Sequence, residues 1–463
     1  MKNQNAMFKT LAVNAIYTLL LMVIINVGYS QTTIGGVLYT STLTEASSPY
    51  HVTSNVFIPE GEVVTVEPGV VLEFDSNISM LIHGAFRAIG NETDSIFFKP
   101  HASAGSGWGA IKWETEADDY NESTGTGNIL SYVSYYGTSS IPPYLWIKDC
   151  KVRIQHSRFH DCPKQFTCLG NAQIYNNLFH NMDAVAIAGG RSSDLEPAQI
   201  YWNEFYNIHD DYSAIYINGG QFIENYVHDI NTPDRILQVG TGSLIAKNRI
   251  ENCNGIGIYT SDYHEESEIY CNTVKNNLVN LYIQCKANVI ISNNNFLNPI
   301  DYNVVLRGTD GPDPYIGYQV SDCDGIPAPG SYDLIDLKGN FWGDLSDTEL
   351  IESFYDFDDD FNIGLKVDAS EPAESMSCRT GAVTLSEENE VDFNLYPNPT
   401  FHYINIDSES TLQSVTILDQ LGRVMFQSLD QSKSINVSEF PVGVYYVQVI
   451  SNAGGGSKVF IKQ

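Results

Sequence analysis

NLFHN, at residues 177–181, is the first full copy of a motif that recurs along the middle of the chain. In each copy an asparagine stands first, an apolar residue third, and an asparagine or aspartate fifth. The copies recur about every 23 residues, and a fixed period of this length is the sequence signature of a repeat architecture. The six copies are Asn177/Phe179/Asn181, Asn203/Phe205/Asn207, Asn225/Val227/Asp229, Asn248/Ile250/Asn252, Asn272/Val274/Asn276 and Asn294/Phe296/Asn298, and Ser157/Phe159/Asp161 is a degenerate copy before them.

A second apolar alternation follows each motif and predicts a strand with one face turned inward. A unit of two or three short strands cannot bury its own apolar face, so successive units must stack at the strand spacing of about 4.8 Å. Asparagine tolerates the left-handed backbone of a corner, and stacked copies can hydrogen-bond along the axis, so we interpret these asparagines as structural. The sequence therefore predicts an all-β parallel β-helix. The alternating segments are 185–187, 215–217, 237–239, 256–258, 281–283 and 304–306.

A leucine-rich horseshoe is the alternative fold, because it also uses a short repeat with a recurring asparagine. The leucine spacing that this fold requires is missing, and no helical periodicity separates the copies of the motif. Both observations favour the β-helix.

Sequence on both sides of the repeat resembles the bacterial right-handed β-helix proteins of the pectate-lyase-like superfamily. The opening coils match at 48–75, 84–100 and 108–113, and the closing coils match at LKGNFWGD (337–344) and at 355–367. The resemblance covers about residues 34–370 and implies a right-handed parallel β-helix, which we assign to residues 31–367. It does not imply an activity, since this fold hosts lyases, hydrolases, epimerases and non-enzymatic adhesins.

The N-terminus reads as a signal peptide at residues 1–30. Lys2 and Lys9 precede an apolar run from Leu11 to Val27, and small residues follow at Gly28 and Ser30. A membrane anchor is the alternative, but no cluster of basic residues follows the run as a stop-transfer signal. We therefore expect export, and no transmembrane segment in the mature chain.

The C-terminal part predicts a separate small β-sandwich. Residues 368–391 are polar and acidic and read as a linker, and short alternating strands with turn residues follow over 392–463. This stretch resembles the C-terminal sorting domain of the type IX secretion system of the Bacteroidetes. The residues that carry the resemblance are Pro397, Asn398, Pro399, Gly443, Tyr445 and Lys458.

The resemblance implies that the outer-membrane machinery recognises this tail, removes it and often links the passenger to a surface lipopolysaccharide. It places the protein in the medium or on the outer-membrane surface. An ordinary carbohydrate-binding sandwich is the alternative for this domain.

Composition narrows the partners. The formal net charge is −32, so nucleic acid is excluded as a partner by repulsion between like charges, and we expect a monomer that contacts neutral glycans or binds with the help of calcium. The eight cysteines lie in an exported chain, where disulfides persist, and Cys162 with Cys168 is the most local pairing.

Outward residues at one position of successive coils form stripes, and a groove along such a stripe suits an extended polymer. One stripe carries ionisable and aromatic residues, and the turns beside it add further polar groups. The stripe reads His160, His180, Tyr206, His228, Glu251, Lys275 and Leu297, and the turns add Asp183, His209, Asp210, Asp211, Asp229, Asp234 and Arg235.

Three roles follow from this chemistry, because imidazoles exchange protons near neutral pH, clustered carboxylates bind calcium or act as an acid and base pair, and tyrosines stack on sugars. The catalytic candidates are His180, His209, Asp210, Asp211 and His228. The substrate-binding candidates are Tyr206, Tyr216, Arg235, Lys275 and Tyr282. The candidate calcium ligands are Asp183, Asp229 and Asp234. The alternative is a solvated outer face without a function, since exposed polar residues are the rule.

Catalytic motifs do not single out a reaction. The pair Asp210-Asp211 resembles the paired aspartates of polygalacturonase-like hydrolases, but the Gly-His and Arg-x-Lys elements of those enzymes are not evident. HExxH, a Walker loop and GxSxG are absent as well. Our hypothesis is that the chain is an exported β-helix protein that binds a polysaccharide. If it is an enzyme, we expect it to cleave that polysaccharide by a lyase or glycoside hydrolase reaction. A non-catalytic adhesin or structural surface protein is the rival hypothesis.

Overall fold

The fold is described from a computed structural model, in which the chain divides into two compact units, Met1–Cys378 and Arg379–Gln463. The predicted signal peptide, Asp210, Asp211 and most of the predicted linker lie outside the residues that the structure describes. These are residues 31–463 without 106, 140–143, 164, 188–196, 210–211, 233, 261–264, 309–310, 313–314, 316–318, 321–322, 324, 377–392, 409–411, 420–423, 429–433, 439, 442, 452–453 and 463.

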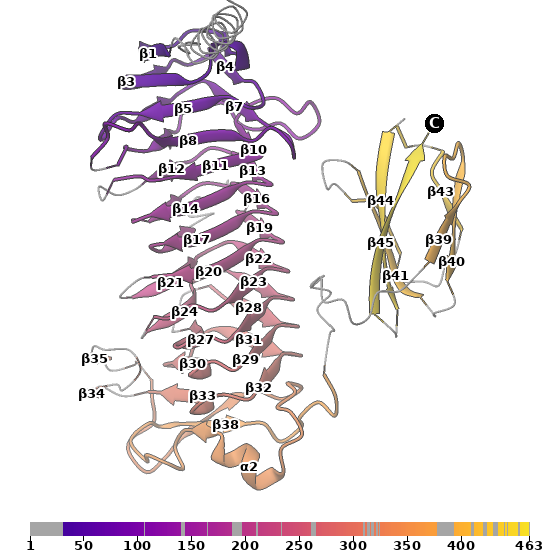
Figure 1. Cartoon of the computed structure of the whole chain (residues 1–463). Helices are drawn as coiled ribbons and strands as arrows, with labels where there is room; N and C mark the ends of the chain where they lie inside the picture. The colour runs from indigo at the N-terminus through magenta and orange to yellow at the C-terminus, as the bar shows by residue number, and fades with distance from the viewer. Residues whose placement is uncertain are drawn as a thin grey trace, which may run out of the picture. The chain divides into compact units, whose positions relative to one another are not determined.

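The first unit is a parallel β-helix, as predicted, and Figure 1 shows its coils following one another along a single axis. Each coil of the repeat contributes three short strands. In one coil these are β16 (Gln173–Tyr175), β17 (Leu178–Met182) and β18 (Val185–Ile187), and in the next β19 (Gln199–Tyr201), β20 (Glu204–Ile208) and β21 (Ser213–Ile217). Every strand pairs in parallel with the equivalent strand of the next coil, so the coils form three rows of strands.

The first row is an 11-stranded sheet, and the second and third rows are joined into one 23-stranded sheet by β1 (Thr32–Val37) and β3 (Tyr50–Ile58), which span both. The first row also contains β2 (Ser41–Leu43), β4 (Val63–Val66), β7 (Ala85–Ile89), β10 (Ile129–Ser131), β13 (Arg153–Gln155), β22 (Gln221–Ile223), β25 (Leu244–Ala246), β28 (Ser267–Tyr270) and β31 (Val289–Ser292). The second row also contains β5 (Val71–Phe74), β8 (Ile96–Pro100), β11 (Val133–Tyr136), β14 (Arg158–Cys162), β23 (Tyr226–His228), β26 (Arg249–Glu251), β29 (Thr273–Lys275) and β32 (Asn295–Leu297). The third row also contains β6 (Met80–Ile82), β9 (Ile111–Trp113), β12 (Leu145–Ile147), β15 (Phe166–Cys168), β24 (Arg235–Val239), β27 (Ile256–Thr260), β30 (Val279–Gln284), β33 (Tyr302–Arg307) and β37 (Phe354–Tyr355).

The remaining elements are short. They are η1 (Glu45–Ser47), β34 (Gly311–Pro312), β35 (Gln319–Val320), β36 (Asp333–Asp336), α2 (Asp347–Glu352) and β38 (Leu365–Asp368). In the described part of the chain no helix separates the copies of the asparagine motif, so the leucine-rich horseshoe is wrong. No helix among the described residues is long and apolar enough to cross a membrane.

The apolar third position of the motif fills the interior of the coils. Phe159, Phe179 and Phe205 are fully buried and stack on one another, with ring centroids 5.1 and 4.9 Å apart. Ile250, Val274 and Phe296 continue this file in later coils. Each inward side chain therefore packs on its equivalent in the next coil, which a single unit could not achieve.

The two asparagine positions of the motif have the two structural roles that the sequence predicted. The first is buried, and its side chain bonds to the equivalent asparagine one coil further on, in an unbroken series from Asn177 to Asn340. The second sits at a corner with positive φ, between 44° and 58° from Asn181 to Asn298. Asparagine and aspartate adopt this left-handed conformation more readily than other side chains, so the sequence period follows the corners.

The disulfides differ from the most local pairing suggested by the sequence. Cys285 is bonded to Cys323, and Cys271 is also disulfide-bonded. Cys162 and Cys168 are free thiols, fully buried in the core of the coils, where they donate to the backbone carbonyls of His160 and Gly170. Both point inward because each occupies an apolar position of its strand.

The second unit consists of antiparallel sheets, consistent with the predicted small β-sandwich. One sheet contains β39 (Phe393–Tyr396), β40 (Tyr403–Ser408) and β43 (Ser434–Asn436). The other contains β41 (Leu412–Asp419), β42 (Val424–Ser428), β44 (Gly443–Ser451) and β45 (Gly454–Lys462). Its own apolar core includes Phe393 and Ile404 from the first sheet and Val447 and Phe460 from the second.

Candidate functional site

The predicted stripe lies on the outer face of the second row of strands, with its members in register from coil to coil. Its first part is a stack of aromatic and imidazole rings, which we call the ring stripe. Successive ring centroids are 4.8, 5.1, 4.9 and 5.4 Å apart, and the planes of neighbouring rings differ by 3° to 24°. The ring stripe consists of Tyr136, His160, His180, Tyr206 and His228.

The ring stripe exposes ring edges. Each inner ring has a neighbouring ring on both faces, so the face of Tyr206 is covered by His180 on one side and His228 on the other. A sugar therefore cannot stack on the ring of Tyr206 as predicted, because both faces of the ring are covered. All five residues of the ring stripe are half-buried, so the stripe presents one partly exposed side chain per coil.

Carboxylates surround the histidines of the ring stripe. Nε2 of His228 lies 2.9 Å from Oε1 of Glu204, and Nδ1 of the same ring lies 2.8 Å from Oδ2 of Asp229. His160 has the same arrangement on one side, with Nδ1 2.8 Å from Oδ2 of Asp161. Carboxylates therefore face both ring nitrogens of His228.

His180 differs from the other two histidines in its electrostatic surroundings. Burial lowers the pKa of His180, and the neighbouring His160 and Arg158 lower it further. The imidazole is therefore neutral near pH 7, which is the form that can accept a proton. His180 lies at the centre of the ring stripe, between His160 and Tyr206.

Below the rings the stripe continues as a charged network around Glu251. This carboxylate is 2% exposed and receives contacts from Nη2 of Arg249 at 2.6 Å, Nζ of Lys275 at 3.0 Å and the hydroxyl of Tyr226 at 2.8 Å. Burial raises the pKa of Glu251, but the hydrogen bonds from Arg249, Lys275 and Tyr226 outweigh it and leave the pKa below its usual value. Lys275, a predicted substrate ligand, is thus engaged with Glu251.

Arg235 and Asp234 form a buried ion pair at the start of β24, a strand of the third row. Nε of Arg235 lies 3.3 Å from Oδ1 of Asp234, and the guanidinium is 4.3 Å from the ring centre of Tyr212 and 3.8 Å from that of Tyr259. The two side chains are 1% and 6% exposed. A contact with a polymer or with calcium would need both of them to become exposed.

The other predicted residues are dispersed. His209 is exposed at the end of β20, Asp183 is half-buried after β17, and Tyr216 is half-buried on the outer face of the third row. Tyr282 is fully buried in an apolar cluster outside the coils, together with Tyr259 and Val305. Among the described residues, Asp183, Asp229 and Asp234 do not gather three ligand atoms at one point, so calcium binding there stays a prediction.

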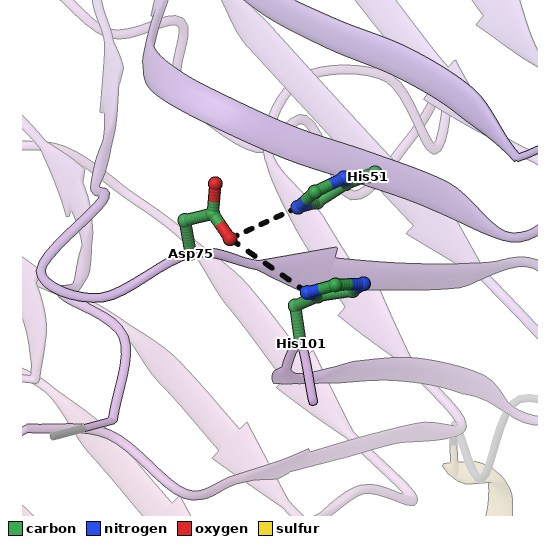
Figure 2. A group of neighbouring side chains, drawn as sticks. All are labelled: His51, Asp75 and His101. Carbon is green, nitrogen blue, oxygen red and sulfur yellow. Dashed lines mark hydrogen bonds and ion pairs between the residues drawn. The ribbon is translucent and has the colours of Figure 1, made fainter. Parts of the chain in front are cut away.

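A group of side chains on the N-terminal coils, drawn in Figure 2, was not predicted from the sequence. His51, Asp75 and His101 come from three successive coils, and both imidazoles turn a nitrogen towards the carboxylate. The signal that could have found them is their spacing of about one coil along the chain, but the asparagine motif that sets the register begins only later.

A groove of about 500 Å³ also lies on these coils, over the third row. Phe57 and Leu81 are neighbours in register on its floor, and Lys112 follows one coil further on. Asn55, Asn77 and Ser79 add polar groups to the lining. The lining of this groove therefore contains both apolar and amide groups, and the groove was likewise not predicted.

The sorting-signal residues gather around the last strand of the second unit. The amide of Asn398, which stands between Pro397 and Pro399, donates to the carbonyl of Val459 and accepts from the backbone N–H of Ile461, both at 2.9 Å. Tyr445 is buried, and its hydroxyl donates to the carbonyl of Pro441. Gly443 opens β44, and Nζ of Lys458 lies 5.5 Å from the ring centre of Phe393.

Comparison with known proteins supports both parts of this description. The right handed beta helix region matches residues 165–316, and the secretion system C-terminal sorting domain matches residues 394–463. Protein bark beetle of Drosophila melanogaster is 34% identical over 71 residues, which is 15% of this chain and only 2% of that protein.

Among solved structures, the periplasmic alginate epimerase AlgG aligns over 73% of this chain and 83% of its own, with 10% identity and a TM-score of 0.45. An aspartate-to-alanine mutant of that epimerase covers the same shares with a TM-score of 0.34.

The first matched region lies within the stacked coils, and the second lies within the antiparallel C-terminal unit. The chain is therefore a right-handed β-helix protein with a C-terminal sorting domain, which the type IX secretion system exports to the cell surface or into the medium.

Proposed function

We propose that the β-helix binds an extended polysaccharide along the ring stripe. The observation that carries this proposal is the regular series of half-exposed ring edges, one per coil, with centroids 4.8 to 5.4 Å apart from Tyr136 to His228. A linear polymer with a short repeat can meet such a series group by group. The hydroxyl groups of Tyr136 and Tyr206 then make hydrogen bonds to sugar hydroxyls.

Charge favours a neutral polymer. Asp161, Glu204 and Asp229 border the ring stripe, and the whole chain carries a net charge of −32. A polyuronate would be repelled by this field unless a cation bridged the two. Calcium-assisted binding of an acidic glycan is therefore a separate form of the proposal, recognisable by its loss when calcium is chelated.

Cleavage is a second candidate function, and one observation favours it. His180 is neutral near pH 7 because burial, His160 and Arg158 lower its pKa, so it can serve as a general base within the ring stripe. His228 is less suited to this role because carboxylates engage both of its nitrogens. Binding without cleavage remains the function that the geometry supports best, and on the cell surface it would be that of an adhesin.

Affinity electrophoresis tests the binding proposal. The exported protein is run in gels that contain neutral or acidic polysaccharides, with calcium or with a chelator, and the polymers are assayed afterwards for new oligosaccharides. Tyr206→Phe removes one hydroxyl and keeps the ring, so we expect about a 2- to 10-fold weaker affinity, as for one lost hydrogen bond. His180→Ala opens the stripe and should weaken binding further.

Tyr201→Phe is the matched control. Tyr201 belongs to the same coil and stacks on Tyr175 at 5.3 Å, but it lies in the first row and thus on another side of the coil. Its substitution should leave retention unchanged. The ring stripe would be contradicted as the binding surface if Tyr201→Phe and Tyr206→Phe weakened retention equally, or if neither substitution changed retention.

A further inference from the structure

We propose that His51, Asp75 and His101 form a binding site for a divalent transition metal of the zinc type. This site lies on the N-terminal coils and is independent of the ring stripe, which begins at Tyr136. It requires no polysaccharide, so its test and the test of the proposed function can succeed or fail separately.

The three residues converge from neighbouring positions of three successive coils: Asp75 and His101 follow strand ends that are paired in register, and His51 is in register with Glu73, two residues before Asp75. His51 lies near the start of β3, Asp75 directly follows β5, and His101 directly follows β8. The backbone of Asp75 bonds to the carbonyl of Val52, and that of His101 bonds to Phe74, which fixes the stagger of the three side chains. Neighbouring strands of a sheet are about 4.8 Å apart, so side chains at neighbouring positions of these coils come within reach of a single ion.

The donor atoms already point at a common centre, as Figure 2 shows. Nε2 of His51 lies 2.9 Å from Oδ1 of Asp75, and Nδ1 of His101 lies 3.7 Å from the same oxygen. Two ligands of a tetrahedral zinc ion are roughly 3.3 Å apart, given metal–ligand bonds of about 2.0–2.1 Å. The observed separations bracket this value, so small side-chain rotations would suffice.

The surroundings hold the donors in place. The two imidazoles stack with centroids 3.9 Å apart and planes 21° apart, which aligns their nitrogens. The hydroxyl of Ser103 lies 2.6 Å from Nδ1 of His101 and donates to Oδ1 of Asp75 at 3.0 Å. Each of the three proposed ligands is only partly buried, so an ion can enter from solvent.

The donor set selects the class of metal. Two imidazole nitrogens and one carboxylate oxygen suit zinc, nickel and copper, whereas calcium takes six to eight oxygen ligands. Nearby Glu73 does not compete for the ion, because it is paired with Lys99 at 3.1 Å and accepts from Gln31 at 2.8 Å. The strongly negative chain also attracts cations.

A bound ion would fasten the first coils together. The ligands belong to three successive coils, which are otherwise joined here by backbone hydrogen bonds between β3, β5 and β8. One ion would therefore bridge these three strands. An ion that binds only the folded protein raises its stability by mass action. Imidazoles must release protons to bind a metal, so the affinity should fall as the pH is lowered.

Metal titration of the exported protein tests the site. The protein is stripped with a chelator and dialysed, then titrated with zinc chloride by calorimetry and with cobalt chloride by visible absorption. His101→Ala removes one of three ligands, and we expect a loss of more than about 100-fold in affinity, beyond the roughly 10–100-fold typical of outer partners. Asp75→Asn keeps the shape and a hydrogen-bond acceptor but loses the charge, so it tests the site without a large packing change.

His83→Ala is the matched control. His83 is a partly buried histidine of the same coils that lies beside Phe57 and Glu116, outside the proposed site. The expected result is one zinc ion that wild type and His83→Ala bind and that His101→Ala and Asp75→Asn do not, with a zinc-dependent rise in unfolding temperature only in the first two. Zinc binding of equal stoichiometry and affinity in all four proteins, or none in wild type, would overturn the proposal.

Discussion

The side chain of Asn225 is bonded to Asn248 of the next coil: Nδ2 of Asn225 lies 3.1 Å from Oδ1 of Asn248, and the backbone nitrogen of Asn225 lies 2.9 Å from the same oxygen. The same amide donates to the carbonyl of Ile200 and accepts from Asn203 of the preceding coil. Each asparagine of the series therefore joins three coils in the buried interior.

We expect Asn225→Ala to lower the free energy of unfolding by about 3 kcal/mol, because buried donors and acceptors on both adjacent coils would lose their partner. Asn254→Ala is the control, since Asn254 is exposed and its side chain donates to the exposed Asn231. Denaturant titration of both variants measures the difference. A similar cost for the two would mean that the asparagine series does not hold the coils together.

The sequence was sufficient to predict this part of the fold, because the period of the motif coincides with the coil. Asn177 and Asn181 mark a buried bond and a left-handed corner, and both constraints repeat in each unit. The register of the ring stripe follows from the same period, so His180 and Tyr206 could be placed side by side without a structure.

The burial of Tyr282, the His51 and His101 pair and the Cys285–Cys323 bond could not be predicted, because they involve chain segments that lie outside the repeat. Tyr282 is at an outward position of its strand, but the apolar cluster that buries it includes Tyr315 and Tyr355 from later segments. The His51 and His101 pair lies on coils without the asparagine motif, where no repeat sets the register. The bond between Cys285 and Cys323 joins the residue after β30 to a segment beyond the repeat, so the spacing of the cysteines gave no indication of it.

Lowering the pH should decrease the free energy of unfolding through protonation of Glu251. Hydrogen bonds from Arg249, Lys275 and Tyr226 outweigh burial and lower the pKa of Glu251 below 4.5 in the folded state. A lowered folded-state pKa adds stability above about pH 4.5, and this stability is lost as the pH falls through the folded-state value. Glu251→Gln should cost about 1–3 kcal/mol at pH 7 and less at pH 3.

Denaturation midpoints of wild type and Glu251→Gln between pH 3 and pH 8 would measure this effect. Glu268→Gln is the control, because Glu268 is exposed on β28. The interpretation fails if the gap between wild type and Glu251→Gln stays constant over the whole range.

The free thiols should be inert in the folded protein. Burial raises the pKa of Cys162 and of Cys253 to about 12 and that of Cys168 to about 11, and it raises the pKa of Cys150 as well. Since the thiolate is the reactive form, iodoacetamide at pH 8 should leave all four unmodified until the protein is unfolded. Peptide mass spectrometry before and after denaturation measures this, and native labelling of Cys162 would show that the coil core opens.

Asn398 should matter for the integrity of the sorting domain. Its amide makes two bonds to the backbone of β45, at Val459 and Ile461, and thereby joins the segment before Thr400 to the last strand of the chain. Asn398→Ala removes both bonds, so we expect the domain to lose about 1–2 kcal/mol of stability and to be cut more readily by protease. Since the sorting domain directs export, we expect the amount of protein at the cell surface to fall as well. Asn394→Ala, at an exposed position of β39, provides the comparison, and equal surface levels for the two variants would separate the Asn398 bonds from export.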